Sequence, residues 1–277
     1  SRSLPSIGYV EANELSRRED RQEYDLPKQP QAAPMDDSAK RYENVIADDA
    51  DFVDFKATIG TKKGQKAVAP GYLKKQWSED GRSYYHYKMD EEILHFYSFL
   101  SGDYTVDRTQ WTNSAGQKLP VEVYYHPGHG YNIEKMQQGA KKALSYYSEN
   151  FGPYPHQQFR IFEFPRYSTF AQSFPNTVPF SEGIGFIAKV GEEDIDYPFF
   201  VTAHEVAHQW WGHQIAPAGV EGAQFLSESL SEYSALMVMK HEKGTDQMRK
   251  FLEHELDDYL SGRSQEDRQE LPLMRVA

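Results

Sequence analysis

Residues 201–214 read VTAHEVAHQWWGHQ and contain the order histidine, glutamate, any two residues, histidine. Residues four apart share one face of an α-helix, so the imidazoles of His204 and His208 can converge on one ion. Glu205 lies beside that face, where its carboxylate can reach a water molecule on the ion rather than the ion itself. Zinc is the expected ion because it accepts imidazole and carboxylate ligands in tetrahedral geometry. The stretch therefore predicts a zinc-binding helix with Glu205 as a general base.

A catalytic zinc ion needs a third protein ligand, and an acidic segment downstream offers one. Residues 226–233 read LSESLSEY and lie in the next predicted helix, with nineteen residues between His208 and Glu228. That spacing leaves room for one turn of chain and an antiparallel return helix, so Glu228 is the predicted third ligand. Glu232 shares its helix face and either orients a ligand histidine from outside or is a solvated surface glutamate.

A zinc site with three histidines does not fit the spacing. Metzincin peptidases place a third histidine six residues after the second, with a glycine three residues after the second. Here those positions hold Gln214 and Trp211, while His213 and Gly212 each lie one residue away from the required place. His213 is therefore predicted to be structural or an outer partner of the site.

Composition excludes several classes of function. The chain has 277 residues, of which 39% are hydrophobic, and this is enough for a packed core. Its formal net charge of -12 argues against a nucleic-acid partner, because phosphate backbones need a basic face. The absence of cysteine excludes thiolate zinc sites, cysteine nucleophiles and disulfides. No apolar run approaches the ~18 residues of a membrane helix, and the polar start is not a signal peptide, so we expect a soluble piece of a longer chain.

The sequence changes character near residue 127. After a polar, proline-rich start to about residue 45, short runs of aromatic and β-branched residues favour strands. Beyond residue 127 apolar residues recur at helical spacing. We therefore predict an α+β chain, with a β-rich domain at 1–126 and a mainly helical domain at 127–277 that carries the zinc site. The elements expected in the second half are a helix from Asn132 to Gly152, a strand at 159–164, a long loop, and helices at about 199–214, 225–243 and 246–260.

The metal motif and its surroundings resemble the gluzincin aminopeptidases, the family of aminopeptidase N. That family adds a tryptophan and a glycine after the second histidine, which Trp210 and Gly212 match, and then leucine, any residue and glutamate, matched by 226–228. The spacer of nineteen residues is one longer than usual in the family and equals that of thermolysin-like enzymes. The resemblance covers about residues 50–277. It implies a partial β-rich N-terminal domain and a thermolysin-like catalytic domain that is truncated at its C-terminus.

The resemblance also implies a residue for the substrate's free amine. Family members carry a Gly-Ala-Met-Glu-Asn strand before the zinc helix, and its glutamate holds that amine. Residues 179–187 read PFSEGIGFI, in which Glu182, Gly185 and Ile187 match, whereas the Gly-Ala, Met and Asn positions do not. Glu182 is therefore the expected amine anchor.

In detail, the segments 171–175, 226–230 and 270–274 resemble aminopeptidase-like domains that bacteria fuse to ABC transporter permeases. This implies a parent protein tethered to a bacterial membrane through segments outside the chain. The family's Tyr-x-Lys-Gly motif, whose tyrosine stabilises the oxyanion, is absent between Glu228 and Ala277. We therefore expect the chain to bind one zinc ion and to be weakly active or inactive.

Three functions stay open. The resemblance favours a zinc aminopeptidase that hydrolyses N-terminal peptide bonds, with a peptide as substrate. A zinc endopeptidase follows if Glu182 does not face the metal. The third candidate function is a zinc-binding module of a transporter that has no turnover. The absence of the Tyr-x-Lys-Gly tyrosine is the reason to retain this candidate.

Overall fold

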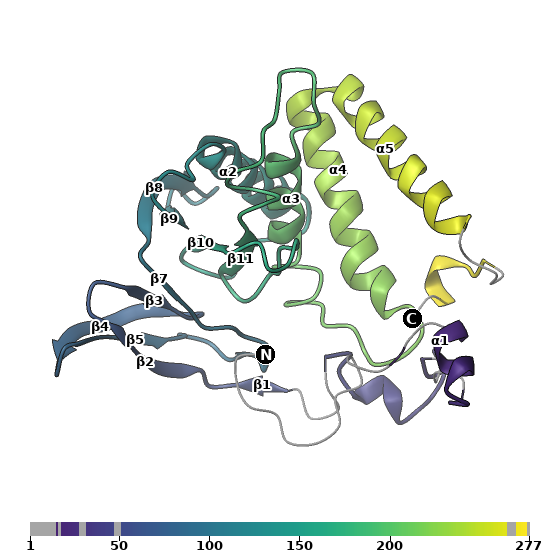
Figure 1. The fold of residues 1–277 in the computed structure, drawn as a ribbon, viewed down its shortest axis with the longest axis horizontal. Coiled ribbons are helices and arrows are strands. Elements are labelled where there is room, and N and C mark those ends of the chain that lie inside the picture. The colour runs from purple at the N-terminus through teal and green to yellow at the C-terminus, as the bar shows by residue number, and fades with distance from the viewer. Residues whose placement is uncertain (1–14, 16–17, 28–31, 47–50, 265–269, 276–277) are drawn as a thin grey trace.

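The N-terminal half of the protein forms a group of short strands, and the C-terminal half stacks helices against a separate sheet (Figure 1). The computed structural model describes residues 15, 18–27, 32–46, 51–264 and 270–275. The first described elements are a short helix α1 (Arg18–Glu23) and a 3₁₀ turn η2 (Lys40–Tyr42). Much of the polar start lies outside the described residues.

The first half is built on an antiparallel sheet in the order β2-β5-β4. Asp80 and Gly81 both adopt positive φ, the requirement of a tight two-residue hairpin turn between β4 and β5. Along β5 the residues alternate, so that Ser83, Tyr85 and Tyr87 are buried. The strands of this half are β1 (Phe52–Val53), β2 (Lys56–Lys62), β3 (Lys66–Val68), β4 (Tyr72–Glu79), β5 (Arg82–Lys88), β6 (Ile93–Leu94) and β7 (Leu100–Gly102), with β1 pairing β6 and β3 pairing β7.

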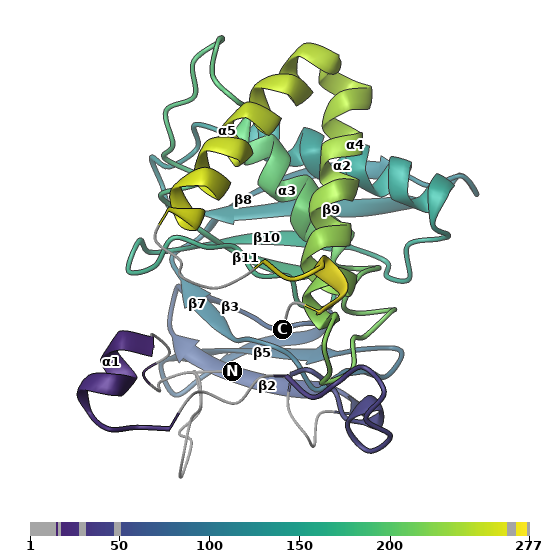
Figure 2. The same ribbon diagram turned by 90° about the vertical axis from the view of Figure 1, so that its right-hand side faces the viewer.

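A second sheet has the order β11-β10-β9-β8 and lies under the helices (Figure 2). Its strands are β8 (Thr105–Thr112), β9 (Lys118–Tyr125), β10 (Phe159–Phe164) and β11 (Thr177–Ser181). β8 is antiparallel to β9, whereas β9, β10 and β11 are parallel. The predicted strand at 159–164 is confirmed and is buried along its whole length. This sheet contains strands from both sides of the boundary predicted at residue 126, since β8 pairs with β9 and β9 pairs with β10. Backbone hydrogen bonds between strands do not depend on the change in composition at that point.

Helix α2 (Ile133–Asn150) packs its apolar face against α3 (Tyr197–Ala207). The approach is close: a Cβ on Gly139 would lie 2.7 Å from the carbonyl oxygen of Phe199, so only glycine fits there. Tyr147 donates a hydrogen bond of 3.1 Å to the carbonyl of Ala203, which sets the position of one helix along the other. The remaining helices are η3, a π-helical turn (Phe225–Ser229), α4 (Leu230–Lys243), α5 (Thr245–Arg263) and the short 3₁₀ turn η4 (Leu273–Arg275).

Two features differ from the sequence-based expectation. Helix α3 ends at Ala207 rather than near Gln214, because Gln209 and Trp210 donate to carbonyls three residues back, and the chain then turns at Gly212 with a φ of 125°. The expected long loop before α3 contains a strand, β11, although it includes Pro179. In the part of the chain that the structure describes, no helix combines the length and apolar character needed to cross a membrane.

Residues 170–174 run back along the outer edge of β11 and form a hairpin with it. Ala171 pairs with Phe180, and Phe174 pairs with Thr177, both in antiparallel fashion. Asn176 turns the hairpin with a φ of 51°, a conformation that asparagine tolerates. Residues 170–174 therefore extend the sheet beyond β11 through two isolated bridges.

Candidate metal centre

Helix α3 and the residue that caps its C-terminus, His208, present two histidines on one side. The Nε2 atoms of His204 and His208 lie 3.0 Å apart. The start of the helix is fixed by Asp196, whose side chain accepts a hydrogen bond from the backbone N–H of Phe199. The spacing of four residues thus brings the two imidazoles together, as the sequence predicts.

Glu228 completes the group from the neighbouring segment. Its Oε2 lies 3.4 Å from Nε2 of His204 and 3.5 Å from Nε2 of His208. Glu228 stands in the π-helical turn η3, and such turns occur often at functional sites. One ligand atom from each of the three residues lies within 4.8 Å of the others. The structure therefore places His204, His208 and Glu228 where one ion could contact all three.

The far nitrogen of each imidazole has its own acceptor. His208 Nδ1 lies 3.0 Å from the carbonyl oxygen of Trp211 and 3.1 Å from Oγ of Ser231. His204 Nδ1 lies 2.8 Å from Oε2 of Glu232, although the contact is too bent for a well-formed hydrogen bond. Because a carbonyl and a carboxylate only accept, both Nδ1 atoms carry hydrogen and both Nε2 atoms are free to bind a metal.

This arrangement fits a zinc ion. Two imidazole nitrogens and one carboxylate are the ligand set of many catalytic zinc sites. Two Nε2 lone pairs 3.0 Å apart repel each other unless a cation lies between them. Without a metal, a proton on His204 relieves this repulsion. Burial lowers the pKa of His204, but the carboxylates of Glu228 and Glu232 have the larger combined effect and raise that pKa to about 10. The same pairing holds the pKa of Glu228 well below its usual value.

Glu205 lies beside the histidines with an unsatisfied oxygen. Its side chain is buried, and Oε2 has no hydrogen-bond partner among the described residues. Burial raises the pKa of the Glu205 carboxyl, against the opposing attraction of His208 and His204. A buried carboxylate oxygen without a partner is rare in a folded protein, and this makes Glu205 a candidate functional residue.

The hairpin strand at 170–174 is tied to the metal helix through Ser173. Ser173 Oγ donates to the carbonyl oxygen of Glu205 at 2.9 Å, and Gln209 Nε2 donates to Ser173 Oγ at 2.6 Å. His213 donates from Nε2 to the carbonyl of Ser173 at 3.1 Å. His213 therefore holds the hairpin against the helix end and is not one of the converging groups, in agreement with the sequence analysis.

Glu182 belongs to a different group of side chains. Its Oε1 accepts a hydrogen bond of 3.1 Å from the backbone N–H of Arg166, and its Oε2 lies 3.8 Å from Nδ1 of His129. His129 in turn contacts the fully buried carboxylate of Glu163, which also accepts the backbone N–H of His126. Among the described residues, no hydrogen bond or ion pair joins Glu182 to the His204 group. Its role as amine anchor stays a prediction.

Sequence reasoning missed two groups at the centre, Ser231 and the carbonyl of Trp211. Ser231 lies three residues after Glu228, so helical spacing places both on one face, and this signal could have been used. The Trp211 carbonyl depends on the turn after α3, which carries no local sequence signature beyond Gly212.

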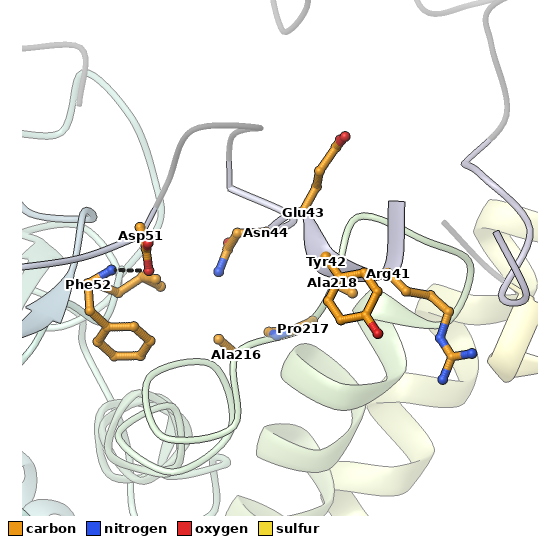
Figure 3. Close-up of a pocket in the computed structure, with 10 residues that line it drawn as sticks. Arg41, Tyr42, Glu43, Asn44, Asp51, Phe52, Ala216, Pro217 and Ala218 are labelled. Carbon is orange, nitrogen blue, oxygen red and sulfur yellow. Dashed lines mark hydrogen bonds between the residues drawn. The ribbon is translucent and has the colours of Figure 1, made fainter. Parts of the chain in front are cut away.

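A separate pocket of about 350 Å³ lies between the segment after η2 and the loop that leaves the metal helix (Figure 3). Its walls are polar and open, and none of the converging ligands lines it. Backbone bridges from Asn44 to Ala218 and from Ala33 to Val220 hold the N-terminal segment against that loop.

The fold is that of zinc aminopeptidases and related zinc metallopeptidases. Legionella pneumophila aminopeptidase A, solved with aspartic acid, matches with a TM-score of 0.65 and 19% identity over 73% of this chain and 25% of its own. An M1 zinc metallopeptidase from Deinococcus radiodurans matches with a TM-score of 0.60 and 16% identity over 82% of this chain and 47% of its own. A form of the same enzyme bound to a Tyr-Ser-Ala substrate gives a TM-score of 0.60 and 17% identity.

The chain thus spans between a quarter and a half of the length of these solved proteins. No family model matches the sequence, and no curated protein matches it either. The likeness therefore rests on the fold, since the identities are below 20%.

Proposed function

We propose that this chain is the metal-binding portion of a zinc-dependent metallopeptidase. One observation carries the proposal: the two Nε2 atoms and the carboxylate of Glu228 converge beside the buried, unpartnered Oε2 of Glu205. The fold of zinc metallopeptidases supports it independently.

The residues divide the chemistry between them. Bound to His204, His208 and Glu228, zinc would supply Lewis acidity that activates a water molecule and polarises the scissile carbonyl. Glu205 Oε2 takes a proton from the attacking water and gives it to the nitrogen of the leaving amine. Its raised pKa favours holding the proton between these two steps. The acceptors at both Nδ1 atoms keep the imidazoles turned toward the ion.

In its finer form, the proposal is an aminopeptidase acting on the N-terminal bond of a peptide. The support is the likeness in fold to an aminopeptidase. Glu182 would hold the substrate's ammonium group by exchanging its contact with His129 for the new cation. The tethering of a parent protein to a transporter permease is likewise proposed from sequence resemblance alone.

An endopeptidase is the second candidate. The observation in its favour is that Glu182 contacts His129 and the Arg166 backbone, rather than any residue of the metal group. Without an acidic anchor at the metal, a peptide would need no free N-terminus to bind.

One assay separates these candidates. Zinc-loaded protein is given an aminoacyl arylamide, its N-acetylated form and an internally quenched peptide. An aminopeptidase cleaves the aminoacyl arylamide and does not cleave its N-acetylated form. An endopeptidase cleaves the internally quenched peptide and does not require a free amine. Tight zinc binding with no cleavage of any substrate would favour a zinc-binding module without turnover over both peptidases. A Glu205→Gln preparation controls for contaminating peptidases.

A further inference from the structure

Ser231 is a fully buried hydroxyl that faces the metal group without belonging to it. It lies on α4, one helical turn after Glu228, and has no exposed surface. Its Oγ lies 3.1 Å from Nδ1 of His208. The consecutive elements η3 and α4 therefore carry a metal-facing carboxylate and a hydroxyl directed at one of the histidines.

The direction of the hydrogen bond follows from the second partner of His208. The carbonyl oxygen of Trp211, 3.0 Å from the same Nδ1, has no hydrogen to give. Nδ1 must therefore carry the hydrogen, and Ser231 Oγ shares it as an acceptor. Nε2 is left with a lone pair, which is the form of histidine that binds a metal.

The two partners of His208 come from different parts of the fold. Trp211 lies in the turn that follows α3, so its carbonyl fixes the imidazole relative to its own helix. Ser231 lies on α4, so its hydroxyl fixes the imidazole relative to the helix that follows Glu228. Of the two described partners of His208 Nδ1, Ser231 is the one that links the orientation of the ring to the helix that follows Glu228.

The charges at the group support a neutral partner on this side. His204 faces the carboxylate of Glu232, whereas His208 faces the hydroxyl of Ser231. One divalent ion would be balanced by the charges of Glu228 and Glu232, and a second outer carboxylate would leave an excess negative charge near the buried Glu205.

We propose that Ser231 is a positioning residue that holds the ring of His208 in its metal-binding orientation and thereby sets the affinity for zinc. The proposal rests on the zinc site of the proposed function. Outer partners of metal-binding histidines typically change metal affinity by about 10- to 100-fold when removed. Because the Trp211 carbonyl remains, we expect the lower end of that range.

The test compares Ser231→Ala with Ser231→Thr, which keeps the hydroxyl, and with Ser229→Ala as a matched control. Ser229 lies two residues away, and the structure gives its described side chain no hydrogen bond. Zinc affinity is measured by competition with a chromophoric chelator, and the visible spectrum of the cobalt-substituted protein reports the ligand field. We expect about tenfold weaker binding and a shifted cobalt spectrum for Ser231→Ala, with Ser231→Thr and Ser229→Ala close to the parent protein.

Thermal unfolding of the metal-free forms separates positioning from general damage. If Ser231→Ala lowers the unfolding temperature of the metal-free protein and leaves the cobalt spectrum unchanged, the role of Ser231 is structural and the proposal is overturned. An unchanged zinc affinity overturns it as well, because the Trp211 carbonyl would then suffice. A parent protein that binds no zinc at all overturns the proposed function first, so the two failures are distinguishable.

Discussion

Within the described residues lie two groups of one or two histidines with glutamates, and the two groups differ in how their charges are satisfied. In each group, one ligand atom from each of three residues lies within 4.8 Å of the others: His204, His208 and Glu228 in the first, His129, Glu163 and Glu182 in the second. In the first group both Nδ1 atoms face acceptors, so the Nε2 atoms point at each other and at a carboxylate. That arrangement would be stabilised by a cation between the three groups.

In the second group the histidine is itself the partner of the carboxylates. His129 Nδ1 contacts Glu163, and each glutamate binds one backbone N–H, from His126 and Arg166. A buried carboxylate is stable when it is paired and hydrogen-bonded in this way. Proximity of ligand atoms therefore does not distinguish a metal centre from an ion pair, whereas the direction of the free lone pairs does.

The largest expected effect is the loss of zinc from the first group only. We expect about one zinc ion per chain after purification without chelator, and almost none in His208→Ala, because two protein ligands are too few for a stable site. His129→Ala is the matched control and should keep its zinc. Metal analysis of the three proteins tests this. Two ions in the parent protein, or a loss of zinc in His129→Ala, would show that the second group also binds metal.

Next in size is the effect of Glu205→Gln on hydrolysis. Glutamine cannot accept a proton, so in any active preparation we expect the turnover rate to fall by about 10²- to 10⁴-fold. Zinc content should stay at the parent value, since Glu205 is not among the converging ligand atoms. Rates and metal content are measured on the same samples. A variant that lost its zinc would mean that Glu205 has been assigned the wrong role.

A smaller effect is expected from the glutamate that faces His204. Glu232→Gln should weaken zinc binding by about 10- to 100-fold, because it leaves the three ligands and removes only the charge near Nδ1. Glu228→Gln should weaken it more, and Glu182→Gln should leave it unchanged. Chelator competition gives all three affinities. Coordinates with zinc bonded to Glu232 and with Glu228 turned away would contradict this order.

The sequence predicted the metal group better than its surroundings. Spacing alone brought His204, His208 and Glu228 together, because helical periodicity is local and α4 returns beside α3. It could not place Glu182, whose side-chain partners, His129 and the backbone of Arg166, come from two separate parts of the chain. Those contacts depend on the parallel pairing of β11 with β10. The sequence analysis predicted a loop where β11 lies, because that segment contains several prolines.

The predicted domain boundary has a similar explanation. Composition changes near residue 127, but hydrogen bonding between strands does not depend on composition. Trp111, Val121 and Val123 from before that point are buried in one core with residues of α2 and α3. The core of the second half therefore begins with β8, which no local pattern in the sequence distinguishes from the strands before it.

The smallest expected effect is a loss of stability in acid that originates beside the first group. His213 holds the hairpin strand against α3, and burial, with a smaller contribution from His208, lowers its pKa to about 4. In the unfolded chain the pKa is ~6.5, so protonation favours unfolding. This contribution to the free energy of unfolding is constant above pH ~6.5 and falls as the pH drops toward 4, by at most ~1.4 kcal/mol per pH unit.

His213→Gln keeps a donor for the Ser173 carbonyl and removes the titration. We expect its metal-free form to lose less stability than the parent between pH 7 and pH 5 in urea unfolding experiments. Some loss should remain, because burial also lowers the pKa of His156 to about 3. His241→Gln, at an exposed position, is the control and should follow the parent curve. Metal-free protein is needed because acid also releases zinc from histidine ligands. If His213→Gln declined in parallel with the parent, the acid sensitivity would have to arise elsewhere in the fold.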